Sequence, residues 1–251
     1  MIGLFDSGIG GLTVLKSLQN FLPNEQYIYL GDTARLPYGT KSPETIQRYT
    51  EQNIHFLNDK KVDLIVSACH SASSAILQFK IQGPVPLFNV IEPSCVEAMK
   101  ETRNNKIGLL ATQATVDAGQ YQKLIDDSYD LFSQSGPMLV PLVEAGWTND
   151  PITDQIIKRY TDPLMAKGVD TIILGCTHFP LLKSSIQKIV GPEVKLIDPG
   201  YCLAERILAV QGQATSSGSL EIFLTDKSPH FIKTAQAILP NQNLKLSQVD
   251  L

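Results

Sequence analysis

The chain has 251 residues, of which 43% are apolar and 18% are charged, and its formal net charge is −4. These values are typical of a globular protein with a substantial core, and they exclude wholesale disorder. The mildly acidic charge argues against non-specific nucleic-acid binding, which requires a basic surface, so we expect no nucleic-acid partner.

The amino terminus and the cysteines predict a soluble protein in a reducing compartment. Residues 1–11 lack the basic segment and cleavable apolar stretch of a signal peptide, and no apolar run approaches the roughly 20 residues of a membrane helix. We therefore expect a cytoplasmic protein with no membrane partner. The four cysteines are too widely spaced to indicate a disulfide framework, so we expect free thiols at Cys69, Cys95, Cys176 and Cys202.

Short apolar runs alternate with amphipathic stretches over the first 90 residues. The expected strands are Ile2–Phe5, Tyr27–Leu30, Val62–Val66 and Val85–Val90. The expected helices are residues 12–22, Pro43–Asn58 with Ser42 as its N-cap, and Ser73–Phe79. This alternation favours a mainly parallel sheet with helices on both faces.

The pattern then restarts, which indicates two similar halves. Residues 107–112 resemble residues 2–7, and residues 169–176 resemble residues 62–69, at offsets of 105 and 107 residues. Two matches in the same order at nearly the same offset favour duplication of an α/β domain over an array of short repeats.

The end of the chain adds elements for which the repeat does not account. Residues 212–220 are polar and rich in serine and glycine, which predicts a loop, and an expected strand at Glu221–Thr225 and helix at Phe231–Leu239 follow. We expect this tail to complete a first domain made of residues 1–93 and 207–251. Residues 94–206 are then expected to form the second domain.

Two of the cysteines occupy equivalent positions in the two halves. Cys69 and Cys176 each follow one of the matched strands, at the sheet edge where parallel α/β proteins bind ligands. The helix expected to begin there should lower the pKa of the thiol and favour the thiolate. A single cysteine of this kind is as often a small buried core residue, but two at equivalent positions favour a chemical role.

Hydroxyl groups and a histidine follow each cysteine. These neighbours are His70 and Ser71 after Cys69, and Thr177 and His178 after Cys176. Hydroxyls together with helix-start amides form a site for an anion, and a histidine beside a thiol can exchange a proton with it. Taken alone, each histidine is more often a helix-start residue hydrogen-bonded to the backbone.

A glycine-rich turn and a proline-containing loop form two further clusters. The turn, residues 6–11, has the sequence Asp-Ser-Gly-Ile-Gly-Gly, but Thr13 stands where a dinucleotide-binding fingerprint needs glycine or alanine. The chain also lacks a phosphate-binding loop that ends in lysine and serine or threonine. The glycines still let a ligand approach the backbone closely. The loop, Leu36–Gly39, is expected to be rigid.

At these clusters the chain resembles the glutamate racemases of the cofactor-independent aspartate/glutamate racemase superfamily. The resemblance runs in order through essentially the whole chain, on the motifs Asp6–Gly11, Gly31–Gly39, Ala68–Ser73, Pro141–Glu144 and Leu174–Pro180. It implies two pseudo-symmetric α/β domains with the active site in the cleft between them. It also implies an isomerase that interconverts L- and D-glutamate and supplies D-glutamate for peptidoglycan synthesis, and thus for the cell wall and cell shape. Neither a metal nor pyridoxal phosphate is implied, and a homodimer is compatible with the resemblance.

The resemblance further implies roles for individual residues. Cys69 and Cys176 are the acid/base pair: one removes the α-proton from one face of the substrate, and the other returns a proton to the opposite face. Asp6 assists Cys69, and His178 with Glu144 assists Cys176. The residues implied to bind the substrate are Asp6, Ser7, Tyr38, Gly39, His70, Ser71, Thr177 and His178.

The chain departs from the family at His70, where the family usually has asparagine. A histidine is bulkier than asparagine, and its ordinary pKa is near 6.5. We therefore expect position 70 to add a titration near neutral pH and to change how a substrate carboxylate is held.

Three alternative functions stay open. Another member of the superfamily would act on aspartate or another amino acid, although its decarboxylases need only one of the two cysteines. A zinc site could use Cys69, His70, Cys176 and His178, but their spacing is not that of a standard closed site. A non-catalytic ligand-binding protein would need no reactive thiols.

Overall fold

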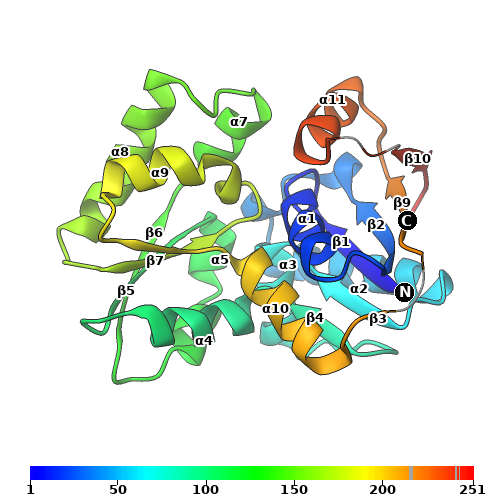
Figure 1. The fold of residues 1–251 in the computed structure, drawn as a ribbon, viewed down its shortest axis with the longest axis horizontal. Helices are drawn as coiled ribbons and strands as arrows, with labels where there is room; N and C mark the ends of the chain where they lie inside the picture. Colours follow the sequence, from blue (N-terminus) through cyan, green and yellow to red (C-terminus); the bar gives the residue numbers. More distant parts are fainter. Residues whose placement is uncertain (215–216, 241, 243) are drawn as a thin grey trace.

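A computed structural model describes residues 1–214, 217–240, 242 and 244–251 of the chain. It contains two parallel β-sheets flanked by helices, one sheet in each half of the molecule (Figure 1). The predicted α/β class with two similar domains is therefore confirmed.

The first sheet has six strands, and all neighbouring strands are parallel. In spatial order they are β10 (Lys245–Gln248), β9 (Ser219–Leu224), β2 (Gln26–Gly31), β1 (Ile2–Asp6), β3 (Leu64–Ser67) and β4 (Leu87–Asn89). The helices of this half are α1 (Leu12–Phe21), α2 (Pro43–Asp59), α3 (His70–Phe79) and α11 (Pro229–Ile238), with the short 3-10 helices η1 (Thr33–Arg35) and η2 (Tyr38–Thr40).

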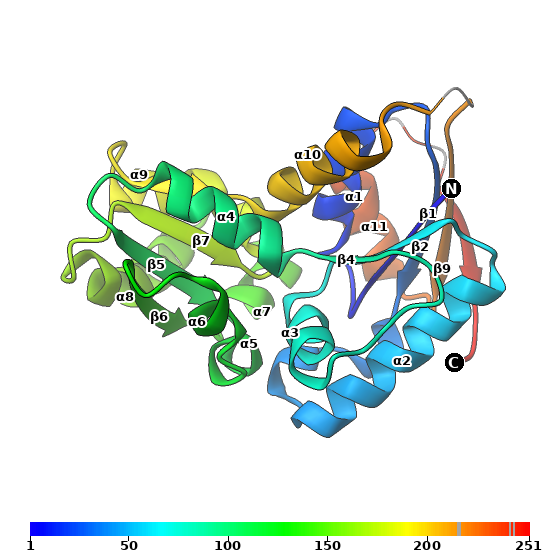
Figure 2. The same ribbon diagram turned by 90° about the horizontal axis from the view of Figure 1, so that it is seen from below.

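The second sheet has four parallel strands. In spatial order they are β6 (Asp130–Ser135), β5 (Lys106–Ala111), β7 (Thr171–Gly175) and β8 (Lys195–Ile197). The helices are α4 (Ile91–Glu101), α5 (Gln113–Asp117), α6 (Gln120–Leu124), α7 (Leu139–Glu144), α8 (Pro151–Met165), α9 (Lys183–Val190) and α10 (Pro199–Gln211), with the 3-10 helix η3 (Phe179–Leu182). Helix α10 packs against α1 of the first half and against α4 of the second, and so lies between the halves (Figure 2).

The two sheets share one strand order. The order β2-β1-β3-β4 in the first sheet corresponds to β6-β5-β7-β8 in the second, so β1 matches β5 and β3 matches β7, as the sequence repeat predicts. The two tail strands extend the first sheet beyond β2. Duplication therefore explains eight of the ten strands in the described part of the chain.

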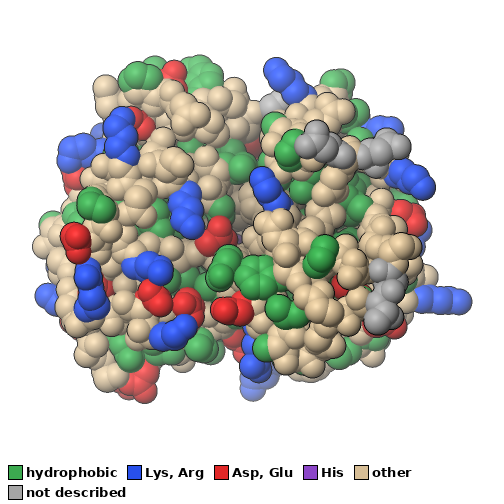
Figure 3. Space-filling model, in the orientation of Figure 1, with side chains coloured by type: hydrophobic (Ala, Val, Ile, Leu, Met, Phe, Trp, Pro, Cys, Tyr) green, Lys and Arg blue, Asp and Glu red, His purple; other side chains and the backbone are tan. Residues whose placement is uncertain are grey.

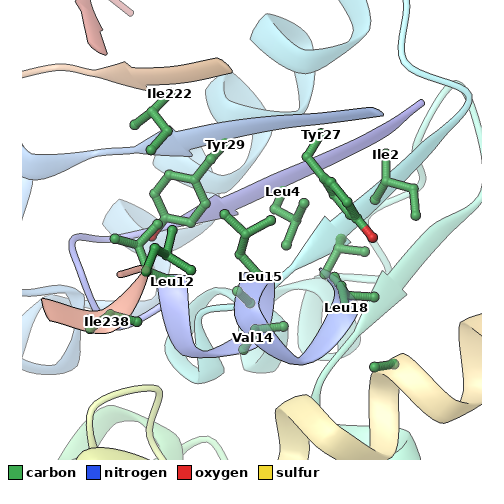
Figure 4. Packing of buried hydrophobic residues seen from close by; sticks show 14 of the residues in the cluster. Ile2, Leu4, Leu12, Val14, Leu15, Leu18, Tyr27, Tyr29, Ile222 and Ile238 are labelled. Carbon is green, nitrogen blue, oxygen red and sulfur yellow. The ribbon is translucent and has the colours of Figure 1, made fainter. Parts of the chain in front are cut away.

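Alternate residues of the central strands face opposite helical layers, as the pleat of a strand requires. Leu4 packs with α1, α10 and α11, whereas its neighbour Phe5 packs with α2 and α3. Figure 4 shows Leu12, Leu15 and Leu18 of α1 pointing toward the sheet. Because both faces are covered, these strands are apolar except at their ends, where β1 ends in Asp6 and β3 in Ser67.

Some element boundaries differ from those expected. Helix α3 begins at His70 and not at Ser73, because the amide of Ser73 donates to the carbonyl of Cys69 (2.8 Å) and closes a first turn there. Strand β4 is shorter than Val85–Val90, since Pro86 has no amide hydrogen to give to a neighbouring strand.

The tail also differs from the expectation. Strand β9 begins at Ser219, inside the predicted loop, and the tail ends in a further strand, β10, which the sequence did not predict. Part of the predicted loop, residues 215–216, lies outside the described residues.

The chain passes twice between the sheets, between β4 and β5 and between β8 and β9. Among the described residues, no strand crosses the predicted boundaries at residues 93/94 and 206/207, although α4 spans the first boundary and α10 the second. The division into 1–93 with 207–251 and 94–206 stays our proposal.

Acidic and basic side chains are interspersed on the face of both halves shown in Figure 3.

Candidate active site

The two matched cysteines line one cavity between the halves. Cys69 follows β3 and Cys176 follows β7, so each lies at the carboxyl end of a central strand. Both thiols are buried and free, and the cavity they line has a volume of about 170 Å³. The geometry brings one thiol from each half to a single small compartment.

The cavity also gathers nearly all the other predicted site residues. Those that line it are Ser7, Tyr38, Gly39, His70, Ser71, Glu144, Thr177 and His178. Asp6 does not line the cavity: it is fully buried behind it and contacts residues that do.

Cys69 has a serine hydroxyl and a carboxylate nearby. Its sulfur is 3.8 Å from the hydroxyl of Ser7. Burial and the nearby Asp6 carboxylate raise the pKa of the Cys69 thiol to about 12. The expectation of a lowered pKa at this position is therefore wrong: burial and the Asp6 charge outweigh the positive end of α3, and Cys69 rests as a thiol.

Asp6 connects the two halves beneath the cavity. Its carboxylate accepts hydrogen bonds from the amide of Gly8 (2.9 Å) and, across the interface, from the hydroxyl of Thr177 (3.2 Å). Burial raises the pKa of the Asp6 carboxyl above its ordinary value, and the nearby His178 opposes this rise.

Cys176 has a cationic partner. Its sulfur lies 3.9 Å from Nδ1 of His178, and Nε2 of the same ring lies 3.3 Å from Oε1 of Glu144, in an ion pair that lacks hydrogen-bond geometry. Burial alone would lower the pKa of His178, but Cys176, Glu144 and Asp6 outweigh it and raise the pKa to about 10. His178 is therefore protonated at neutral pH and can give a proton to Cys176.

The glycine turn after β1 permits this close contact between the halves. A Cβ atom on Gly10 would lie 2.3 Å from the Thr177 hydroxyl and 2.6 Å from Nδ1 of His178. The hydroxyl of Thr13 donates to the carbonyl of Thr177 (3.0 Å). The structure therefore shows that this turn approaches the opposite half closely.

His70 is buried at the start of α3 and lines the cavity. Neither ring nitrogen has a hydrogen-bond partner among the described residues, and burial lowers the pKa of the imidazole to about 3. The expected titration near neutral pH is therefore wrong, because the buried ring stays neutral.

Several cavity residues were not predicted. They are Gly8, Leu36, Pro37, Thr40, Thr112, Gln113, Gly136, Pro137, Val140 and Pro141. Thr112 could have been found, because the repeat aligns it with Ser7. Its hydroxyl lies 3.3 Å from that of Ser71, so this pair also joins the two halves.

The described residues also bear on a zinc site and on a membrane-spanning helix. Among the described residues, no group of three or more His, Cys, Asp or Glu side chains is arranged to hold a metal ion. In the same part of the chain, no helix combines the length and apolarity needed to cross a membrane.

Known proteins match this chain over nearly its full length. The profile of the Asp/Glu/Hydantoin racemase family matches residues 7–207. A glutamate racemase of Aquifex pyrophilus is 46% identical over 233 residues, which cover 91% of this chain and 90% of the relative.

Solved structures agree with these matches. A glutamate racemase isoform from Bacillus anthracis has a TM-score of 0.95 at 32% identity, covering 100% of this chain and 97% of that one. The Francisella tularensis glutamate racemase in complex with D-glutamate has a TM-score of 0.90 at 34% identity, covering 99% and 97% of the two chains. With a matching fold, a matching profile and two opposed cysteines, this chain belongs to the Asp/Glu/Hydantoin racemase family.

Proposed function

We propose that the protein is a glutamate racemase that interconverts L- and D-glutamate by a two-base mechanism. The observation that carries this proposal is the pair of buried thiols, Cys69 and Cys176, which come from equivalent strand ends of the two halves and line one cavity. The full-length similarity to glutamate racemases supports glutamate as the substrate.

In the proposed reaction, a thiolate on one side of the cavity removes the α-proton. The electron pair of the broken C–H bond stays on the α-carbon, and the opposite thiol donates its proton to the other face. One cysteine is protonated as the other is deprotonated, so the roles exchange with the hand of the substrate.

The groups behind each thiol restore its protonation state between turnovers. Protonated His178, held by Glu144, is proposed to exchange a proton with Cys176. The Asp6 carboxylate is proposed to do the same for Cys69, whose high pKa requires a nearby proton acceptor.

Hydrogen bonds in the cavity are proposed to hold the substrate and stabilise the carbanion-like state. Among the hydroxyl and imidazole groups that line the cavity, five are proposed to bind the substrate: those of Ser7, His70, Ser71, Thr177 and His178. The loop at Tyr38–Gly39 forms another wall, and Asp6 is proposed to attract the substrate ammonium through its charge.

The test is racemisation by purified protein that has been dialysed against chelator, without added pyridoxal phosphate. Circular dichroism of L-glutamate and of D-glutamate should each decay to zero, and L-aspartate should react more slowly. Decay with aspartate alone would identify a different racemase, and activity that returned only with a metal or pyridoxal phosphate would contradict the cofactor-independent mechanism.

The cellular setting is a proposal of the same kind. A cytoplasmic enzyme that supplies D-glutamate for peptidoglycan synthesis is expected to restore growth to a bacterial strain that requires added D-glutamate. We also propose a homodimer, which light scattering at assay concentration would test.

A further inference from the structure

A buried carboxylate outside the cavity organises one of its walls. Asp32 directly follows β2 and is fully buried. It accepts hydrogen bonds from Nε of Arg35 (2.7 and 2.8 Å), from the hydroxyl of Thr225 (3.0 Å) and from the hydroxyl of Tyr38. We call these four residues the Asp32 cluster.

The cluster fixes the ring of Tyr38 from behind. Tyr38 lines the cavity, yet its hydroxyl faces away toward Asp32 and also accepts a hydrogen bond from Nδ2 of Asn53 (3.1 Å). Burial and the Asp32 charge raise the pKa of Tyr38 well above its ordinary value, so the phenol stays a donor. The ring and the backbone of the Tyr38–Gly39 loop are therefore presented to the cavity in one orientation.

Thr225 joins this cluster from the far end of the sequence. It directly follows β9, 193 residues from Asp32, and does not line the cavity. Besides donating to Asp32, its hydroxyl accepts from the amide of Ala34 (2.9 Å), and its own amide donates to the carbonyl of Gly31 (3.1 Å).

A second pair of hydrogen bonds strengthens the same connection. The hydroxyl of Thr33 donates to the carbonyl of Asp226 (2.6 Å) and accepts from its amide (2.8 Å). The end of β9 thus holds residues 31–34 at several points, and this segment leads directly into the Tyr38–Gly39 loop.

We propose that Thr225 is a positioning residue: through Asp32 it fixes Tyr38, so that the carboxyl-terminal strand β9 orders one wall of the substrate cavity. Only the kinetic test of this inference rests on the proposed racemisation of glutamate. Removing a donor from a buried carboxylate is costly because the lost hydrogen bond is not replaced by water. We therefore expect the loop to loosen in Thr225→Val.

The kinetic test compares Thr225→Val with Thr225→Ser and with a matched control. Thr102→Val is suitable because Thr102 is also half-buried and donates to an aspartate (Asp170, 2.7 Å), but at the opposite, amino-terminal ends of strands β5 and β7. We expect Thr225→Val to raise KM about tenfold with kcat within about threefold. Thr225→Ser should restore KM, and Thr102→Val should leave it unchanged despite a similar fall in Tm.

A double-mutant cycle tests the route through Tyr38. Tyr38→Phe removes the hydroxyl that reaches Asp32, so adding Thr225→Val to it should change KM less than about twofold. If the KM of the double variant rose by the product of the two single effects, the proposal would be overturned. A Thr225→Val enzyme with normal KM and lowered Tm would overturn it as well.

Hydrogen exchange tests the same inference without activity. In Thr225→Val, the backbone amides of residues 32–41 should exchange at least about fivefold faster than in wild type and in Thr102→Val. Unchanged exchange there would overturn the proposal. A wild-type protein that does not racemise glutamate would instead contradict the proposed function, while hydrogen exchange would still decide the role of Thr225.

Discussion

Individual side chains of the site differ in charge according to their burial and neighbours. His70 and His178 are both almost fully buried, yet His70 has no charged partner among the residues that the structure describes and has a pKa of about 3, whereas His178 faces Glu144 and has a pKa of about 10. The two halves thus offer a neutral imidazole beside Cys69 and an imidazolium beside Cys176. These imidazoles do not occupy duplicated positions, because the offset of 107 residues aligns His70 with Thr177 and His178 with Ser71.

Both site cysteines should be essential. Cys69→Ala and Cys176→Ala should each lower the rate of racemisation by a factor of about 10² to 10⁴. A general acid or base contributes that factor, and neither thiol has a substitute among the cavity residues. Circular dichroism of glutamate measures the rate. Cys95→Ala is the control, since Cys95 is buried in α4 away from the cavity, and near wild-type turnover in either site variant would exclude the two-base mechanism.

His70 should act without titrating. His70→Asn is expected to change kcat/KM by less than about tenfold while preserving the shape of its pH profile between pH 6 and 9, because a group with a pKa of about 3 stays neutral there. The exposed His55 gives a matched control, His55→Asn. A step near pH 6.5 present in wild type and absent only from His70→Asn would show that the ring titrates.

At the level of elements, the turns at the strand ends position the chemistry. The turn after β1 carries Asp6 and Gly10 to the opposite half, where they meet Thr177 and His178. Because these contacts join the two halves next to the cavity, the turn determines how closely the segments that carry the two thiols approach.

Gly10→Ala should therefore impair catalysis while the protein still folds. The new methyl group would lie 2.3 Å from the Thr177 hydroxyl and must displace the Thr177–His178 segment, and a shift of about 1 Å can cost about 10² in rate. The kcat for L-glutamate measures this loss. Gly8→Ala in the same turn should be milder, because its methyl group would have only a 3.5 Å contact with Leu36, and equal kcat in both variants would contradict the steric argument.

Local signals predicted elements well, and distant pairings poorly. Helix α2 was expected almost to the residue because Ser42 caps it (3.3 Å to the amide of Thr45) and Pro43 starts it. Strand β10 was missed because it is mostly polar and pairs only with β9 at the sheet edge. The cysteines were found from the repeat, but the Asp32 cluster was not, since Asp32 and Thr225 are brought together only by the pairing of β2 with β9.

At the scale of the whole molecule, duplication places two equivalent sheet edges face to face. The carboxyl ends of β3 and β7 supply the thiols, and cross-interface hydrogen bonds from Thr177 to Asp6 and between Ser71 and Thr112 hold the halves together around the cavity. The groups that serve the proposed reaction therefore also contribute to the stability of the assembled protein.

Stability should fall as the pH rises. The pKa of His178 is about 10 in the folded protein against 6.5 when exposed, so its stabilising protonation is complete below pH 6.5 and is lost as the pH approaches 10. Urea unfolding measures this effect. The free energy of unfolding should decrease less between pH 7 and pH 9 in His178→Gln than in wild type. His55→Gln is the control, and equal pH dependence in all three proteins would contradict a raised pKa.

The place of β9 in the first sheet has a consequence for the order in which a nascent chain folds. Because β9 pairs with β2, the ribosome must deliver residues 219–248 before the first sheet can close that edge, whereas all strands of the second sheet lie between residues 106 and 197. Until β9 pairs with it, the exposed edge of β2 can bind other chains. The half that is synthesised first is therefore expected to be the last to finish folding.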